Sequence, residues 1–301
     1  MQLFGGIEAG GSKFVCAIGD STGNIKNRIV IPTTTPNETL PQVIKFFQAA
    51  HDAEPLAGIG VASFGPIELD RNSPFYGYIT TPPKPGWGQC DFLGIMRKAF
   101  KNMPLGWDTD VNGAAMGEYR FGAAKGLDTF IYVTIGTGIG AGGMVSGKLM
   151  HGLIHPEMGH IFIPHDKAKD NFAGTCPFHG DCFEGLANGP AMQKRWNVKS
   201  ATDLPANHPA WDLEAEYIAL AFANYIMTLS PQKIILGGGV TKRKEIFPMI
   251  RQKVVALLNG YIKSEKILTK IDEYIVEPGL GEQSGICGAI ALAEAELKNA
   301  K

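Results

Sequence analysis

Residues 3–19 read LFGGIEAGGSKFVCAIG, which is typical of a strand, a glycine-rich turn and a second strand in direct succession. Residues 129–147 read TFIYVTIGTGIGAGGMVSG and repeat this pattern in the second half of the chain. A third strand is predicted after each hairpin, at 25–33 and from 148 onward. The approximate duplication predicts an α/β fold of two similar halves, in which the two glycine-rich hairpins face each other across a cleft.

The remaining pattern completes each half with helices and further strands. Helical periodicity is predicted at 36–50, 91–101, 112–121, 211–229, 242–258 and from 285 onward, and short apolar strands are predicted at 56–66, 104–110, 233–239 and 273–278. We place the domain boundary near residue 115. The N-terminal domain is then 1–115 together with the final helix, about 285–301, and the C-terminal domain is 116–284.

The composition excludes several classes of partner. The chain has 301 residues, a net charge of −1 and 38 glycines, so it offers no basic surface for nucleic acid or for an anionic membrane. The first residues lack a basic region followed by an apolar run, so we expect no signal peptide. The five cysteines are odd in number and mostly scattered, which favours a reducing compartment, and we expect a cytoplasmic location.

Three glycine clusters are candidate phosphate-binding turns. They are Glu8–Lys13, Gly136–Gly140 and Gly237–Gly239, each at the end of an apolar strand. Phosphate oxygens need convergent backbone N–H donors, and the absence of a Cβ allows close approach. The last cluster leads toward a predicted helix, whose N-terminus favours anions. Tight turns without a ligand are the alternative. A dinucleotide fold fits less well, because a strand follows the second cluster, and a Walker A loop is absent.

Asp110 is the candidate catalytic base. It follows the predicted strand 104–110 and precedes a helix, where ligand sites of α/β proteins lie. Phosphoryl transfer to an alcohol needs a base near the attacking hydroxyl, and an Asp can accept that proton. Asn112 could orient the alcohol or the Asp. Helix capping by Asp110 is the alternative role. Asp108 is the weaker candidate.

A cluster of histidine and cysteine predicts a metal site. Cys176, His179 and Cys182 follow Cys-x2-His-x2-Cys spacing, and His160 completes four nitrogen and sulfur ligands. Such a set leaves no open coordination position, so the predicted zinc is structural. A DNA-binding zinc finger is the rival interpretation, but this region has no basic recognition helix.

Together these motifs resemble the ROK family, in the family's order and across nearly the whole chain. The matching segments are Glu8–Lys13, Thr109–Asn112, Gly136–Gly140, Glu157–His160, Cys176–Glu184 and Gly237–Val240. The resemblance implies the two-domain actin-like, or ribonuclease-H-like, ATPase fold and a sugar kinase that uses Mg²⁺ and ATP. It implies Asp110 as the catalytic base and a set of sugar-binding residues: Thr109, Asn112, Glu157, His160 and Glu184. It also implies a nucleotide-binding set: Glu8, Gly10, Gly11, Ser12, Lys13, Thr137, Gly138, Gly238 and Gly239.

The sugar is indicated by a different segment. Residues 76–87, YGYITTPPKPGW, are similar to bacterial ROK fructokinases rather than glucokinases, so fructose is the expected acceptor. A hexokinase, mannokinase or glucokinase of the same family and a non-enzymatic sugar-binding regulator remain the alternatives. The chain departs from the family pattern at Glu8, usually Asp, at Thr109, often Asn, and at His179, which replaces a Cys. The family also implies a homodimer.

Overall fold

The computed structural model describes residues 2–82 and 84–299, and the chain forms two compact units. Unit 1 comprises Met1–Gly126, Leu149–Pro156 and Gly279–Lys301, and unit 2 comprises Leu127–Lys148 and Glu157–Pro278. The boundary that we expected at residue 115 falls inside helix α3 (Asp110–Phe121). This helix packs along the last helix, α10 (Ser284–Asn299), so it stays whole within unit 1.

A five-stranded sheet forms the centre of unit 1, with strand order β3-β2-β1-β4-β7. The strands are β1 (Leu3–Ala9), β2 (Lys13–Asp20), β3 (Ile25–Pro32), β4 (Leu56–Ser63) and β7 (Leu105–Thr109). β1 and β2 are antiparallel, whereas β1, β4 and β7 are parallel. The register pairs Ala9 with Ser63 and Ser63 with Thr109, so three strands end at one edge. Ligand sites of α/β proteins lie at such an edge.

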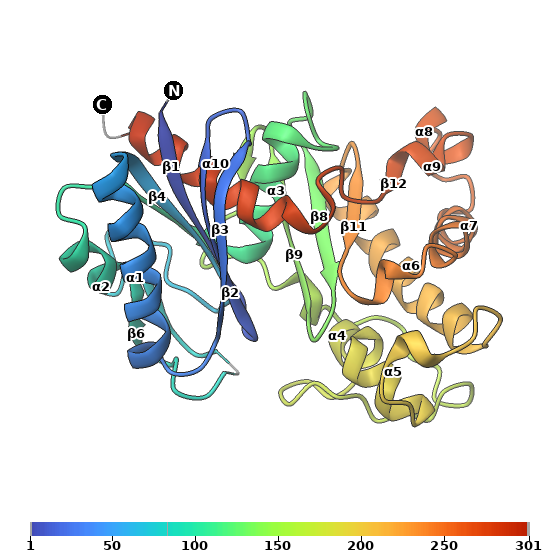
Figure 1. Ribbon diagram of the computed structural model, residues 1–301. Coiled ribbons are helices and arrows are strands. Elements are labelled where there is room, and N and C mark those ends of the chain that lie inside the picture. The colour runs from blue at the N-terminus through green and yellow to red at the C-terminus, as the bar shows by residue number, and fades with distance from the viewer. Residues whose placement is uncertain (1, 83, 300–301) are drawn as a thin grey trace. The chain divides into compact units, whose positions relative to one another are not determined.

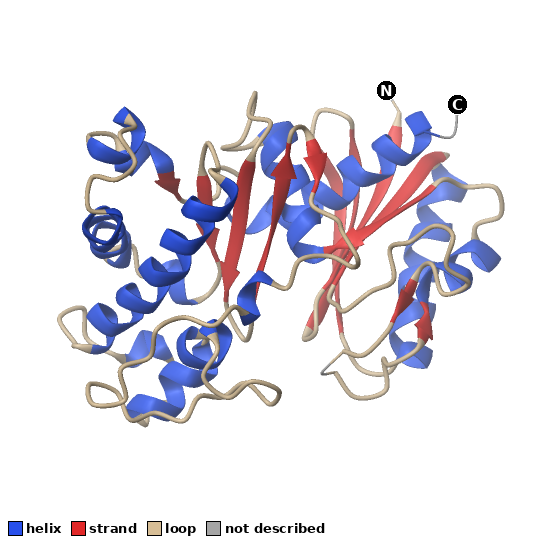
Figure 2. Ribbon diagram, turned by 180° about the vertical axis from the view of Figure 1, so that it is seen from behind, coloured by secondary structure: helices blue, strands red, loops and turns tan. Residues whose placement is uncertain are grey.

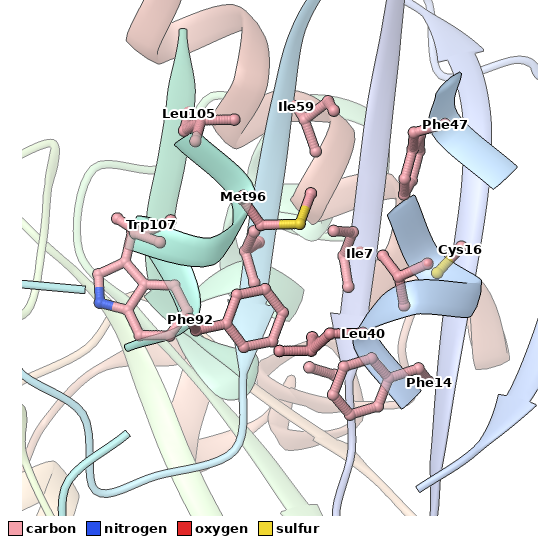
Figure 3. Packing of buried hydrophobic residues seen from close by; sticks show 14 of the residues in the cluster. Ile7, Phe14, Cys16, Leu40, Phe47, Ile59, Phe92, Met96, Leu105 and Trp107 are labelled. Carbon is pink, nitrogen blue, oxygen red and sulfur yellow. The ribbon is translucent and has the colours of Figure 1, made fainter. Parts of the chain in front are cut away.

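Helices cover both faces of this sheet, as Figure 1 shows. Helices α1 (Pro36–Ala53) and α2 (Phe92–Ala99) cover one face, and α3 and α10 cover the other. Because successive strand residues point to opposite faces, Ile7 and Trp107 join the α1/α2 core. Figure 3 shows this core, which packs Phe14, Leu40, Phe47, Ile59, Phe92, Met96 and Leu105 around them. The adjacent Glu8 and Asp108 consequently point to the α3/α10 face.

The α3/α10 face depends on small residues. A Cβ at Gly288 would lie 1.6 Å from the carbonyl oxygen of Gly113, and one at Gly60 would lie 1.9 Å from that of Ala289. Both distances are far below van der Waals contact, so α10 sits directly against the backbone of α3 and β4. The glycines therefore fix how deeply α10 enters unit 1.

Unit 2 repeats the plan of unit 1, with strand order β10-β9-β8-β11-β12 (Figure 2). Its strands are β8 (Phe130–Ile135), β9 (Ile139–Val145), β10 (Lys148–Leu149), β11 (Ile234–Gly237) and β12 (Ile275–Val276). β8 is antiparallel to β9 and parallel to β11, as β1 is to β2 and β4. The expected duplication is thereby confirmed. The helices are α4 (Phe183–Ala187), α5 (Gly189–Trp196), α6 (Ala210–Leu229), α7 (Ile246–Leu258), α8 (Glu265–Leu268) and α9 (Ile271–Tyr274).

Two predicted elements of unit 2 were wrong in extent. The helix expected at 242–258 is a 3-10 turn, η3 (Val240–Lys242), followed by α7 from Ile246. A helix from residue 242 would place Pro248 in its interior, whereas α7 holds it in the first turn, where its missing N–H costs nothing. The strand expected at 273–278 is largely α9, and only Ile275–Val276 pair with β11.

No helix within 2–82 and 84–299 is long and apolar enough to cross a membrane.

Candidate functional site

Asp110 is the first residue of α3 and directly follows β7. The helix begins two residues earlier than predicted, because Thr109 is its N-cap and accepts a hydrogen bond from the Asn112 amide at 3.1 Å. The capping role considered for Asp110 therefore belongs to Thr109. An Asp110 oxygen accepts from the Val111 amide at 2.9 Å, which holds the carboxylate at the positive end of the helix. Asp110 is thus presented at the carboxyl edge of the sheet.

Asp108 holds a buried polar network beneath Asp110. Its Oδ1 accepts from the Thr109 amide and from Asn112 Nδ2, both at 2.8 Å, and its side chain is almost fully buried. Asn112 Nδ2 also donates to the carbonyl of Met150 at 3.3 Å. The amide of Asn112, an expected sugar ligand, is therefore engaged within the protein. Its orientation is set by Asp108, which the sequence had ranked as the weaker candidate.

Two histidines that sequence reasoning left without a role attach segment 149–156 to unit 1. His151 Nε2 lies 2.9 Å from Asp108 Oδ2, and this hydrogen bond raises the pKa of His151. His155 is buried, and its Nε2 accepts from the Ile67 amide at 3.2 Å. Burial lowers the pKa of His155, so its ring is neutral and able to accept this bond. The only sequence signal was the crowding of histidines after residue 150.

Segment 76–87, which suggested fructose, lies near His155 in unit 1. Strand β5 (Tyr78–Ile79) belongs to this segment and pairs antiparallel with β6 (Cys90–Asp91), which follows it in the chain. Trp87 is fully buried, and its indole nitrogen donates to the carbonyl of Thr34 at 2.8 Å. Ile79 pairs with Ile67, the residue that His155 binds. Pro83 of this segment lies outside the described residues.

Glu8 lies close to Asp110 on the α10 face of unit 1. Burial raises its pKa to about 7, and the charge of Asp110 adds to the increase. A Cβ at position 285 would lie 2.6 Å from Glu8 Cδ, so Gly285 of α10 leaves the space that this side chain fills. The turn after β1 is fixed by its own bonds, from the Gly10 amide to the Lys13 carbonyl at 3.0 Å and from Thr33 Oγ1 to the Gly10 carbonyl at 2.7 Å. A Cβ at Gly11 would meet no atom of residues 2–82 and 84–299 within 4 Å, apart from its own chain neighbours.

The predicted metal ligands gather in unit 2. His160 ends the 3-10 turn η1 (Met158–His160), and Cys176, His179 and Cys182 precede α4. One ligand atom from each of the four residues lies within 4.8 Å of all the others. Nδ1 of His160 is 3.6 Å from both sulfurs, and Nδ1 of His179 is 3.6 Å from Cys176 Sγ. Both rings thus direct a nitrogen toward the thiols.

Three expected sugar ligands lie beside this cluster. His160 Nε2 is 3.9 Å from Glu184 Oε1, so the ring has one nitrogen toward the cysteines and the other toward the carboxylate. Burial raises the pKa of Glu157, and the Glu184 charge adds to it, which indicates that the two carboxylates are close. Glu157, His160 and Glu184 therefore form one polar group within unit 2.

Glu184 also contacts the glycine turn between β8 and β9. Its Oε2 accepts from the Ile139 amide at 2.8 Å, and a Cβ at Gly138 would lie 2.7 Å from the same oxygen. The Gly189 amide donates to the Gly136 carbonyl at 2.8 Å from the other side. The turn is therefore held by α4 and α5, and the amide of Ile139 is already used within the protein.

The third glycine cluster follows β11 but does not open a long helix. Gly238 has φ +101° and packs against the end of β8, where a Cβ would lie 2.3 Å from the carbonyl of Ile135. Only η3 follows, so the dipole of a long helix, expected here, does not reach Gly239. A Cβ at Gly239 would meet no atom within 4 Å.

The sequence of this chain matches the model of the ROK family over residues 4–296. The chain belongs to the ROK family. Among its relatives, the fructokinase of Pediococcus pentosaceus is 48% identical over 99% of this chain and 100% of its own length. The fructokinase of Zymomonas mobilis subsp. mobilis is 44% identical over 97% and 96%.

A solved member of the family has the same fold. The ROK hexokinase of Thermus thermophilus superposes with a TM-score of 0.77 at 24% identity, covering 99% of this chain and 100% of the hexokinase. This similarity confirms the actin-like ATPase fold expected from the sequence. Among the predicted residues of this ROK protein, unit 1 brings together Glu8, Asp110, Thr109 and Asn112, and unit 2 brings together Glu157, Glu184 and the four His and Cys ligands.

Proposed function

We propose that this ROK protein is an ATP-dependent fructokinase, which converts D-fructose and ATP to D-fructose 6-phosphate and ADP. The observation that carries the proposal is the carboxylate of Asp110 at the carboxyl edge of the unit 1 sheet, in a chain whose relatives named fructokinase match it over nearly their full length. The segment 76–87, beside the Asp108 network, supports fructose as the acceptor.

In the proposed reaction Asp110 accepts the proton of the sugar hydroxyl. The hydroxyl oxygen then forms a bond to the γ-phosphorus while the bond from that phosphorus to the bridging oxygen breaks, and ADP leaves with the electron pair. Catalysis by the protein consists mainly of placing these groups in line and stabilising the phosphoryl charge. Asp110 is suited to this role because the start of helix α3 fixes its position.

The sugar-binding set is assigned to both units. Glu157, His160 and Glu184 supply two carboxylates and a ring nitrogen, which are suited to several sugar hydroxyls. Thr109 and Asn112 complete the proposed set from the start of α3.

The nucleotide is assigned to the glycine turns. Gly10, Gly11, Ser12 and Lys13 in unit 1 and Thr137, Gly138, Gly238 and Gly239 in unit 2 would bind its phosphates through backbone amides and small side chains. Glu8 is the assigned Mg²⁺ ligand, directly or through water, because Mg²⁺ prefers carboxylate oxygens in a phosphate site. When bound, Mg²⁺ neutralises phosphate charge.

The His and Cys cluster is assigned to a structural zinc ion. A tetrahedral zinc with Zn–N of about 2.1 Å and Zn–S of about 2.3 Å has an N···S edge of about 3.6 Å. The three N···S distances of 3.6 Å agree with that edge. Zinc here would fix His160, and through it the Glu184 carboxylate.

A homodimer and a cytoplasmic location stay predictions. The buried free cysteines are consistent with a cytoplasmic location.

An ADP-release assay with fructose, mannose, glucose and N-acetylmannosamine tests the proposal. We expect fructose to have the highest kcat/KM, because hydroxyl geometry selects among hexoses. Preference for glucose or mannose would instead assign the chain to the hexokinases of the family. If the protein released no ADP with any of the four sugars, a sugar-binding regulator would be favoured.

A further inference from the structure

The carboxylate of Glu118, near the end of α3, is completely buried and surrounded by donors. Its Oε2 accepts from the amides of Ala123 at 2.7 Å and Gly279 at 2.9 Å. Its Oε1 accepts from the amide of Leu280 at 3.0 Å and from Ser284 Oγ at 2.7 Å. A carboxylate has about four lone-pair positions, so these four donors saturate it. A glutamate that served only as part of a helix would not need four hydrogen-bond donors around its carboxylate.

The donors belong to the two segments through which the chain leaves and re-enters unit 1. The chain passes into unit 2 after Gly126 and returns at Gly279, and these are two of its four passages between the units. Ala123 lies shortly before the first passage, and Gly279 and Leu280 lie directly after the second. A single side chain therefore binds both segments, on their unit 1 side, to α3.

The packing leaves no slack around this carboxylate. A Cβ at Gly122 would lie 2.1 Å from Glu118 Oε2, and a Cβ at Gly279 would lie 2.7 Å from the Ala123 amide. Gly117, one residue before Glu118, faces the carbonyl of Ser284, which a Cβ would approach to 2.3 Å. The two segments thus lie against each other and against α3, and the same helix carries Asp110 at its other end.

We propose that Glu118 is a positioning residue for phosphoryl transfer, which fixes the unit 1 ends of two inter-unit connections to the helix that carries Asp110. The inference rests on the proposed kinase function, because it assigns Glu118 a role in that reaction. Glu118 touches neither sugar nor nucleotide in this role. It acts by holding the two connecting segments at fixed positions on the helix that carries Asp110, since an error of about 1 Å in alignment can cost about a hundredfold in rate.

Glu118→Gln is the sharpest test, because it keeps the shape but converts one acceptor oxygen into a donor, which then faces the backbone N–H of Leu280 or, with the amide turned over, those of Ala123 and Gly279. We expect kcat for fructose phosphorylation to fall between about tenfold and a hundredfold while KM for fructose and ATP changes less than about twofold. Hydrogen exchange should quicken in both 122–126 and 279–284. A merely structural role would lower the yield of folded protein and leave kcat of the folded fraction unchanged.

Ser284→Ala removes one of the four hydrogen bonds of Glu118, so it should lower kcat and quicken hydrogen exchange as Glu118→Gln does, but by a smaller amount. This variant keeps the inference testable if Glu118→Gln does not fold. Glu294→Gln is the matched control. It alters another buried glutamate that joins the same two helices, through Arg120 Nη2 at 2.7 Å, but binds neither connection. We expect it to leave kcat unchanged.

Wild-type kcat in a folded Glu118→Gln protein, or in Ser284→Ala with unchanged exchange, would overturn the inference. Faster exchange in only one of the two segments would also overturn it, because the carboxylate would then not join them. Failure of the proposed function is seen separately, as wild-type protein that releases no ADP with any sugar. The exchange measurement still decides in that case whether Glu118 joins the two segments.

Discussion

His151 Nε2 and Asp108 Oδ2 lie 2.9 Å apart, although 43 positions separate them in the sequence. The same carboxylate binds Asn112 through its other oxygen at 2.8 Å. One buried aspartate thus connects segment 149–156 to the start of the helix that carries Asp110. Protonation of His151 adds a charge to this connection, so its strength depends on pH.

The folding stability of the protein should depend on whether His151 is charged. The bond to Asp108 raises the pKa of His151 on folding, so its contribution is fully present below the unfolded pKa, 6.5, and is lost as pH rises through the folded value. We expect the Tm difference between wild type and His151→Asn to be largest near about pH 5.5 and small by about pH 9. A His151→Asn difference that is constant or grows with pH would contradict the pairing.

Replacement of the proposed base should abolish turnover without unfolding the protein. Asp110→Asn keeps the shape of the side chain but cannot accept the hydroxyl proton, so we expect kcat to fall by about a thousandfold or more. Binding of fructose and ATP, followed by calorimetry, should remain measurable. Asp52→Asn, at the exposed end of α1, is the control. Turnover of Asp110→Asn near the wild-type level would remove Asp110 from its assigned role.

The glycine turn of unit 2 should tolerate a methyl group at one position and not at another. A Cβ at Gly138 would lie 2.7 Å from Glu184 Oε2, whereas a Cβ at Gly136 would meet no atom within 4 Å. We therefore expect Gly138→Ala to raise KM for ATP by about tenfold or more and to lower Tm, because the turn must move. Gly136→Ala should have a clearly smaller effect on Tm. Equal effects would mean that Glu184 does not hold the turn.

Metal content should follow the His and Cys cluster. We expect about one zinc per chain to survive desalting in wild type, and Cys182→Ser to lose it and to lower Tm, because structural zinc contributes to folding. Cys90→Ser, which changes a buried cysteine of unit 1, should keep the metal. Plasma emission spectrometry checks both. Fresh reduced wild type without zinc would refute the site.

Local pattern was sufficient for much of the fold and for the clustering of His160, Cys176, His179 and Cys182. The two hairpins were predicted because strand alternation and glycine turns act over a few residues. Cys176, His179 and Cys182 were predicted because their spacing is short and chemically distinctive. The start of α3 was placed two residues late, since Thr109 and Asp110 are both good caps and only the folded backbone decides between them.

Contacts between distant residues could not be predicted in this way. Asp108 and His151 meet because β7 and segment 149–156 pack together, and no pattern in either segment indicates the other. Glu118 reads as an ordinary residue of an amphipathic helix, and its burial follows from the return of the chain at Gly279. The roles of Asp108, His151 and Glu118 depend on packing between distant segments, so they could not be predicted from the sequence alone.

The position of α10 has a consequence for biosynthesis. This helix closes the α3/α10 face of the first sheet and provides the space for Glu8 at Gly285, yet the ribosome makes it after all of unit 2. The nascent N-terminal half therefore emerges with an uncovered apolar surface. Phe4, Val15 and Ala17 on this surface still lack the packing that Ile286 and Ile290 provide in the folded protein. Domains usually fold in order of emergence, but here the second unit can mature before the first. Nascent chains of this protein should accordingly rely on a chaperone such as a ribosome-bound holdase until α10 has emerged from the ribosome.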